Sequence, residues 1–150
     1  MKARTKSQRT EDVPTGGLGR KFSEEEARAK RVLLIDDYIL FREALANLCT
    51  QHTGLDSNVQ VGSLAEARQV LSSYNSNDFA LMVVDLDLPD DGGMELIGEV
   101  HRAGIPVLTL TTSRDPQRIA QALRLGADEV LTTAASGDEI LDAVRRLVGG

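Results

Sequence analysis

Four carboxylates follow an apolar run near the middle of the sequence. The segment 81–93, LMVVDLDLPDDGG, places Asp85, Asp87, Asp90 and Asp91 within seven residues. Carboxylates gathered at the end of a buried strand repel one another and resist desolvation, so they persist where a cation or a reaction holds them. The segment is therefore the first candidate for a functional site.

Apolar runs alternate with amphipathic segments along the rest of the chain. The runs predict strands, and apolar residues spaced three and four apart predict helices. Helix starts are marked by Asp115 before Pro116 and by Ser136 with Glu139. Five strand-helix units imply an α/β fold with a parallel sheet covered on both faces, because parallel strands need right-handed helical crossovers. The predicted strands are 32–35, 58–61, 80–84, 106–110 and 129–132, and the predicted helices are 39–48, 64–71, 94–100, 116–125 and 136–147.

Polar residues stand where four of these strands end. A parallel sheet binds ligands at the carboxyl ends of its strands, so we expect these residues to meet at one edge. Carboxylates and hydroxyls gathered in this way are typical of a magnesium and phosphoryl site. The residues are Asp36 and Asp37, Asp85, Thr111 and Thr112, and Thr132 and Thr133.

The chemistry of such an edge follows from the residue types. Mg²⁺ prefers oxygen ligands and commonly takes one or two carboxylates, which Asp36, Asp37 and Asp85 can supply. An aspartate can attack phosphorus to give an acyl phosphate when a metal neutralises the transferring group. A hydroxyl placed as Thr111 is could then bond a phosphate oxygen and pass the modification to the following loop.

The charge of the chain is unevenly distributed. Residues 1–31 carry nine Lys or Arg against five Asp or Glu, whereas residues 32–150 carry eight against eighteen. The acidic part argues against nucleic-acid binding, which needs a basic face. The single cysteine excludes an internal disulfide and, with no signal peptide and no apolar run of membrane-spanning length, predicts a cytoplasmic protein without membrane contact.

The first 30 residues differ in composition from the remainder. They mix charges with Ser, Thr and the run PTGGLG and show no apolar period, so residues 1–30 are interpreted as a disordered, basic leader. Residues 31–150 are predicted to form one domain, for which 41% apolar content is sufficient.

Four motifs occur in order along the chain: VLLIDD at 32–37, DLDLPDDGGMEL at 85–96, PVLTLT at 106–111 and GADEVL at 126–131. In sequence and spacing they resemble the receiver domain of bacterial two-component response regulators. The resemblance covers residues 31–149, and ASGDEILDAVR at 135–145 is similar to receivers that precede LuxR-type helix-turn-helix domains.

The resemblance implies a flavodoxin-like, doubly wound sheet of five parallel strands in the order 2-1-3-4-5. It implies that Asp85 is the phosphoacceptor and Thr111 the switch hydroxyl. The Mg²⁺ ligands would be Asp36, Asp37, Asp85 and the backbone carbonyl of Asp87. A sensor histidine kinase would be the donor, the receiver would form a homodimer, and the protein would regulate transcription without being an enzyme beyond self-phosphorylation and autodephosphorylation.

Two positions depart from the family pattern. Thr133 occupies the place of the lysine that contacts the phosphoryl group, and no lysine follows Lys30. Losing that cation should slow phosphorylation or weaken its effect. Arg114, in the loop after Thr112, is a candidate surrogate. Val130 stands where many receivers have Tyr or Phe, so an aromatic readout is excluded.

The same residues also allow other interpretations. Asp37 could cap the first helix, Asp90 or Asp91 could serve a turn, and Thr112 could be a strand residue with a satisfied hydroxyl. The chain could be an atypical receiver that acts as a phosphorylation-independent interaction module. A third alternative is a haloacid-dehalogenase-like phosphohydrolase, because the sequence from Asp85 to Asp87 resembles the nucleophile motif of that class.

Overall fold

The structure is a computed structural model and describes residues 30–90 and 92–149. The predicted leader, residues 1–30, lies outside the described part except for Lys30, so its interpretation stays a prediction. None of the helices in the described ranges combines the length and apolar character that crossing a membrane requires.

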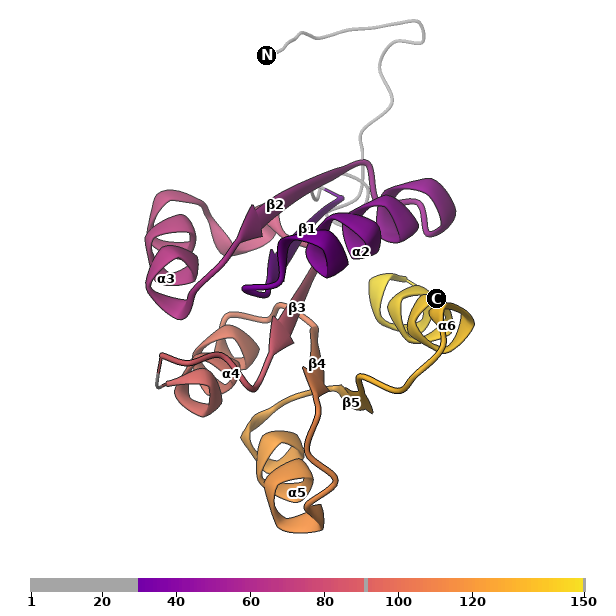
Figure 1. Ribbon diagram of the computed structural model, residues 1–150. Coiled ribbons are helices and arrows are strands. Elements are labelled where there is room, and N and C mark those ends of the chain that lie inside the picture. Colours follow the sequence, from indigo (N-terminus) through magenta and orange to yellow (C-terminus); the bar gives the residue numbers. More distant parts are fainter. Residues whose placement is uncertain (1–29, 91, 150) are drawn as a thin grey trace, which may run out of the picture.

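Strands and helices alternate along the described chain, as the sequence predicts (Figure 1). The helix labels begin at α2, and a short 3₁₀ turn, η1 (Ser76–Asp78), precedes β3. The strands are β1 (Arg31–Ile35), β2 (Ser57–Val61), β3 (Leu81–Asp85), β4 (Val107–Thr111) and β5 (Glu129–Thr132). The helices are α2 (Ile39–His52), α3 (Leu64–Ser73), α4 (Gly93–Arg102), α5 (Pro116–Leu125) and α6 (Gly137–Val148).

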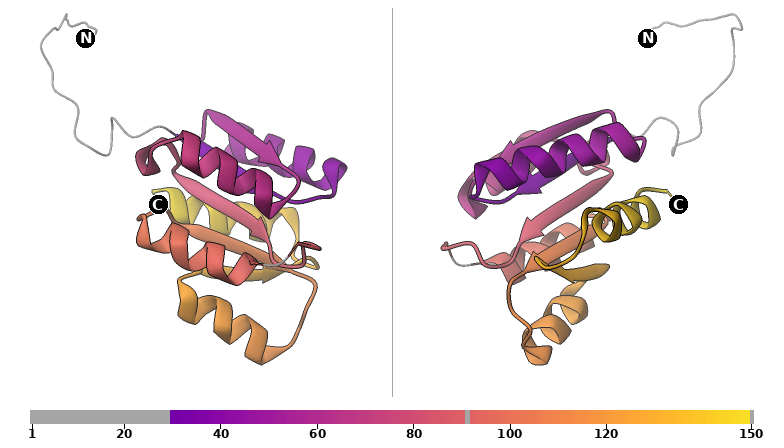
Figure 2. Two further views of the ribbon diagram at one scale, coloured as in Figure 1. Left: turned by 90° about the vertical axis from the view of Figure 1, so that its left-hand side faces the viewer. Right: turned by 45° about the vertical axis from the view of Figure 1, so that its right-hand side comes forward.

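The five strands form one parallel sheet in the order β2-β1-β3-β4-β5. Helices α3, α4 and α5 cover one face, and α2 and α6 cover the other (Figure 2). This is the flavodoxin-like arrangement that the family resemblance implies, and the predicted fold class is confirmed.

The alternation of side chains along β1 explains why its residues 32–35 are all apolar. Leu33 and Ile35 belong to the core beneath α3, α4 and α5, whereas Val32 and Leu34 belong to the core beneath α2 and α6. All four are at most 1% exposed. A strand buried on both faces needs apolar residues at every position, because neither face reaches water.

The predicted helix starts are found with their capping contacts. In α6 the Ser136 hydroxyl accepts a hydrogen bond from the Glu139 N–H, and the Glu139 carboxylate accepts one from the Ser136 N–H. The Asp115 side chain accepts a hydrogen bond from Gln117 N–H at the start of α5. These local contacts fix where α5 and α6 leave the edge of the sheet at which β4 and β5 end.

Replacing Gly126 by alanine is expected to lower the free energy of unfolding by about 2–4 kcal/mol. Gly126 ends α5 with φ +124°, and a Cβ there would overlap the Cβ and Cγ of His101 on α4. Gly104→Ala is the control, because Gly104 also has a positive φ, +84°, but faces open space. Urea unfolding of both variants separates backbone strain from the clash. Equal losses of stability in the two would contradict a role for the contact with His101.

Candidate functional site

The register of the sheet brings the polar strand ends together. Ile35 pairs with Val84, so Asp36 and Asp85 are the next residues of their neighbouring strands. Asp85 in turn pairs with Leu110, the residue before Thr111, and Thr111 pairs with Thr132. The carboxylates and hydroxyls that the sequence predicts at one edge therefore lie at one edge.

Three carboxylates form the centre of this edge. Oxygen atoms of Asp36, Asp37 and Asp85 all lie within 4.8 Å of one another. Asp36 is 8% exposed and Asp37 is exposed, so the cluster opens to solvent on one side. An all-oxygen donor set of this size, open to water, fits a hard divalent cation such as Mg²⁺.

The alternative in which Asp37 caps the first helix is wrong. Tyr38 is the N-cap residue of α2, and no side chain caps that end. The Asp36 carboxylate accepts a hydrogen bond of 2.8 Å from the Tyr38 N–H instead. Asp37 is therefore left facing the carboxylate cluster with no capping role.

The cluster raises the affinity of its carboxylates for protons. Burial of the Asp85 carboxylate raises its pKa to about 6, and the charges of Asp36, Asp87 and Asp37 add to the effect. A hydrogen bond from the Asp87 N–H, 2.8 Å from Asp85 Oδ1, opposes it. Burial likewise raises the pKa of Asp36. Ionising Asp36 and Asp85 therefore costs free energy unless a cation offsets their charge.

The raised pKa of Asp85 predicts how stability changes with pH in the absence of metal. The folded protein holds the Asp85 proton up to about pH 6, whereas the unfolded chain releases it near pH 4. This contribution to stability is therefore present below pH 4 and is lost as the pH rises through about 6. Asp85→Asn should remove the loss, so the variant should be more stable than the parent at pH 7 by about 1 kcal/mol after allowance for solvent screening.

Urea unfolding of parent and Asp85→Asn at pH 4 to 8, in the presence of a chelator, measures this difference. The gap between the two proteins should widen between pH 4 and 6 and then stay constant. A gap that does not depend on pH would contradict the assignment of the raised pKa to Asp85.

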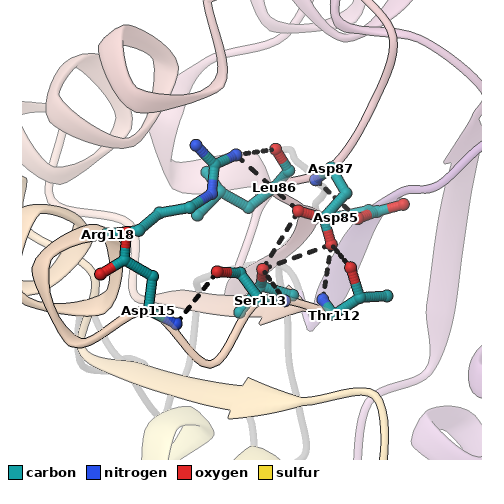
Figure 3. Close-up of polar contacts among 8 residues, drawn as sticks. Asp85, Leu86, Asp87, Thr112, Ser113, Asp115 and Arg118 are labelled. Carbon is teal, nitrogen blue, oxygen red and sulfur yellow. Dashed lines mark hydrogen bonds and ion pairs between the residues drawn. The ribbon is translucent and has the colours of Figure 1, made fainter.

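The side chain of Asp87 collects hydrogen bonds from the end of β4 (Figure 3). Its carboxylate accepts from the Thr111 hydroxyl at 3.1 Å, from the Thr112 hydroxyl at 2.9 Å and from the Thr112 N–H at 2.5 Å. The Thr111 oxygen also accepts a bond of 3.0 Å from the Ser113 N–H. The β3–α4 loop, β4 and the β4–α5 loop are therefore joined through one carboxylate.

A basic side chain from α5 reaches the same loop. Arg118 Nη2 donates a hydrogen bond of 2.9 Å to the Leu86 carbonyl and lies 3.8 Å from Asp87 Oδ1. Figure 3 shows its guanidinium directed at Leu86 and Asp87, the two residues that follow Asp85. Arg114, the surrogate cation considered from the sequence, is exposed. Arg118, and not Arg114, is the arginine that bonds the loop next to Asp85.

The remaining predicted positions also reach the edge or its border. Thr133 is exposed, and its N–H donates to the Thr111 carbonyl at 3.0 Å, so the position without lysine adjoins Thr111. Asp90 serves a structural purpose: one of its oxygens accepts from the N–H groups of Leu64 and Ala65 at the start of α3. Asp91 lies outside the described residues.

Thr112 lies at this edge, as predicted. Its hydroxyl is satisfied by Asp87, but the residue lies just beyond the end of β4 and not in the strand. Sequence reasoning missed one member of this site, Arg118. The only signal for it in the sequence is its position two residues after Pro116, which places it in the first turn of a helix that begins at this edge.

Comparison with known proteins identifies the family. The family model "Response regulator receiver domain" matches residues 32–145. The regulatory protein UhpA of Salmonella typhimurium is 29% identical over 120 residues, which are 79% of this chain and 59% of that protein. The transport regulator DctD of Pseudomonas aeruginosa is 34% identical over 119 residues, 77% of this chain and 24% of that protein. The chain thus spans 59% or less of the length of these relatives.

Solved structures agree with this assignment. The signal receiver domain of the response regulator NarL from Mycobacterium tuberculosis has a TM-score of 0.66 at 25% identity, covering 80% of this chain and 96% of that one. A LuxR-family response regulator from Aurantimonas sp. has a TM-score of 0.68 at 22% identity over 80% and 85% of the chains and supports the fold alone. The chain therefore belongs to the receiver domain family of two-component response regulators.

Proposed function

We propose that the chain accepts a phosphoryl group on Asp85, with Mg²⁺ bound at Asp36, Asp37 and Asp85, and that this modification changes its association with other proteins. The observation that carries the proposal is the carboxylate cluster, in which oxygens of three residues from two neighbouring strand ends lie within 4.8 Å. Asp85 stands at the end of the central strand β3, where it is open to a donor.

The other residues of the edge have roles in this proposal. The backbone carbonyl of Asp87 is a further Mg²⁺ ligand, and Thr111 is the hydroxyl that reports the phosphoryl group to the β4–α5 loop. Thr133 is a position that tunes the rate of phosphorylation, because its side chain carries no positive charge. Mg²⁺, when bound, offsets the negative charge of the group being transferred. The Asp85 carboxylate supplies the nucleophile.

A sensor histidine kinase is the proposed donor, and the surface beside the cluster suits a protein partner. Tyr38, Ile39 and Leu40 follow Asp37 directly and are 63%, 56% and 69% exposed. Three consecutive exposed apolar residues next to a reactive site are typical of a surface that another protein covers. The named relatives are transcriptional regulators, so an output on transcription and self-association of the receiver are proposed by analogy.

A second candidate is the phosphorylation-independent receiver, for which the Asp87 contacts provide a specific observation. The Asp87 carboxylate accepts hydrogen bonds from the hydroxyls of Thr111 and Thr112. A receiver whose switch threonine is engaged by its own carboxylate can present one conformation to partners regardless of phosphorylation. The comparisons offer no support for the phosphohydrolase alternative.

Incubation with acetyl phosphate and Mg²⁺, followed by intact mass, distinguishes the two candidates. We expect a gain of one phosphate per chain and no gain when a chelator removes the metal. A parent protein that never gains mass, while Thr133→Lys does, would instead favour the phosphorylation-independent receiver.

A further inference from the structure

The edge that would receive the phosphoryl group is strongly negative. The charged groups that shift the pKa of Asp85 are Asp36, Asp87 and Asp37, and all of them are carboxylates. A phosphoryl group adds a charge of about −1.5 to −2 at neutral pH. Phosphoryl transfer is accelerated mainly by positive groups placed where this charge develops. A cation of the protein would therefore accelerate the transfer in addition to the metal.

Two arginines among residues 30–90 and 92–149 bond to the backbone beside the cluster. Arg42 on α2 donates to the Asp36 carbonyl at 2.8 Å, and Arg118 on α5 donates to the Leu86 carbonyl at 2.9 Å. Residues 31–150 contain no lysine. Arg42 comes from α2 and Arg118 from α5, which cover opposite faces of the sheet, so their surroundings decide between them.

The guanidinium of Arg42 is already occupied on the side of β2. Its Nε donates to Gln60 Oε1 at 3.2 Å while Nη1 holds the Asp36 carbonyl. These two hydrogen bonds hold Arg42 beside Asp36, between β1 and β2.

Arg118 contacts the loop after β3, where Asp87 bonds Thr111 and Thr112. Its side chain is 39% exposed and lines a pocket of about 260 Å³ together with residues of the β3–α4 loop and the start of α4, so it has room to move. Its ion pair with Asp87 is long, 3.8 Å, and a partly exposed pair of that length is weak. Asp87 shares its carboxylate between Arg118 and the donors Thr111 and Thr112.

We propose that Arg118 supplies the positive charge that binds the phosphoryl group on Asp85, and that Asp87 positions Arg118 until the group arrives. The proposal rests on phosphorylation of Asp85. In the transfer, an Asp85 oxygen forms a bond to the phosphorus of an acyl phosphate. The bond from phosphorus to the donor's carboxylate oxygen breaks, and the electron pair leaves with that carboxylate, so no proton is required. Arg118 then exchanges the carboxylate of Asp87 for the more highly charged phosphoryl oxygens.

The test compares Arg118→Ala, Arg118→Lys and Arg124→Ala in the full chain with acetyl phosphate and Mg²⁺. Arg124 is the matched control, because it lies on the same helix, is exposed and carries the same charge. Arg118→Ala should reduce the rate of phosphate gain about ten- to hundredfold. Arg118→Lys should retain more of the rate, and Arg124→Ala should equal the parent.

A structural role of Arg118 is separated by two further measurements. Adding Thr133→Lys to Arg118→Ala should restore much of the rate, because Thr133 adjoins Thr111 and a lysine there offers a cation from β5. Arg118→Ala should also bind beryllium trifluoride, a stable phosphoryl analogue, more weakly by fluorine NMR, while its affinity for Mg²⁺ stays that of the parent.

The outcomes distinguish this inference from the proposed function. A phosphorylated parent with Arg118→Ala equally fast overturns the role of Arg118 and leaves phosphorylation of Asp85 intact. A slow Arg118→Ala that neither Arg118→Lys nor Thr133→Lys improves also overturns it, because the loss is then structural. A parent that gains no phosphate overturns the proposed function and this inference with it.

Discussion

Asp85→Asn is expected to abolish phosphate gain from acetyl phosphate completely, while the protein stays folded. The amide keeps the size of the carboxylate but is a poor nucleophile toward phosphorus, so no acyl phosphate forms. Stability should not fall, because removing one negative charge relieves repulsion with Asp36, Asp37 and Asp87. Intact mass measures the first effect, and urea unfolding at pH 7 measures the second.

Asp87→Asn is the matched control for this prediction. It removes one carboxylate from the same loop and keeps both the Asp85 nucleophile and the backbone carbonyl of residue 87. It should still gain phosphate, at a rate that reports the contacts with Thr111, Thr112 and Arg118. Phosphate gain in Asp85→Asn equal to that of the parent would place the modification on another residue and reject Asp85 as the acceptor.

Combined replacement of Asp36 and Asp37 by asparagine is expected to weaken Mg²⁺ binding by at least about a hundredfold. The two residues contribute two of the three carboxylates that lie within 4.8 Å of one another. The same change should stabilise the metal-free protein, because it removes like charges from a partly buried cluster. Calorimetric titration with Mg²⁺ measures the affinity, and thermal unfolding with and without the metal measures the two effects on stability.

The double variant should thus bind Mg²⁺ more weakly than the parent and yet be more stable than the parent without the metal. The control is Glu43→Gln with Asp142→Asn, which removes two exposed carboxylates from α2 and α6. This pair should leave Mg²⁺ affinity within about twofold of the parent, because exposed charges outside the carboxylate cluster are screened by salt. Parental affinity for Mg²⁺ in the Asp36 and Asp37 double variant would show that the metal binds elsewhere.

The sheet could be predicted from the sequence because its signals are local. Apolar runs mark the strands, and caps such as Asp115 and Ser136 mark where helices begin. The end of α2 was predicted less well: the helix continues to His52, beyond the predicted end at Leu48. Its last turn carries polar residues such as Gln51 and has no apolar period. The helix ends before Gly54, which has φ +80°.

The carboxylate cluster was also predictable, but the contacts around it were not. Asp36 and Asp85 meet because both follow buried strands of one parallel sheet, a rule that needs only the strand positions. The bonds of Asp87 depend on the course of the loop after β3, which no periodicity encodes. Arg118 lies in the first turn of a helix, where an arginine usually faces solvent. Its contact with the Leu86 carbonyl follows from tertiary structure alone.

The covering of one sheet face by α2 and α6 has a consequence for synthesis of the chain. Ile140, Ala143 and Val144 of α6 pack against the same core as Leu45 and Cys49 of α2. Residues of the central strands, such as Leu34 and Leu108, stay without half of this cover until α6 has left the ribosome. Since a domain generally folds as a unit, a stalled chain that lacks α6 should expose this face to chaperones or to aggregation.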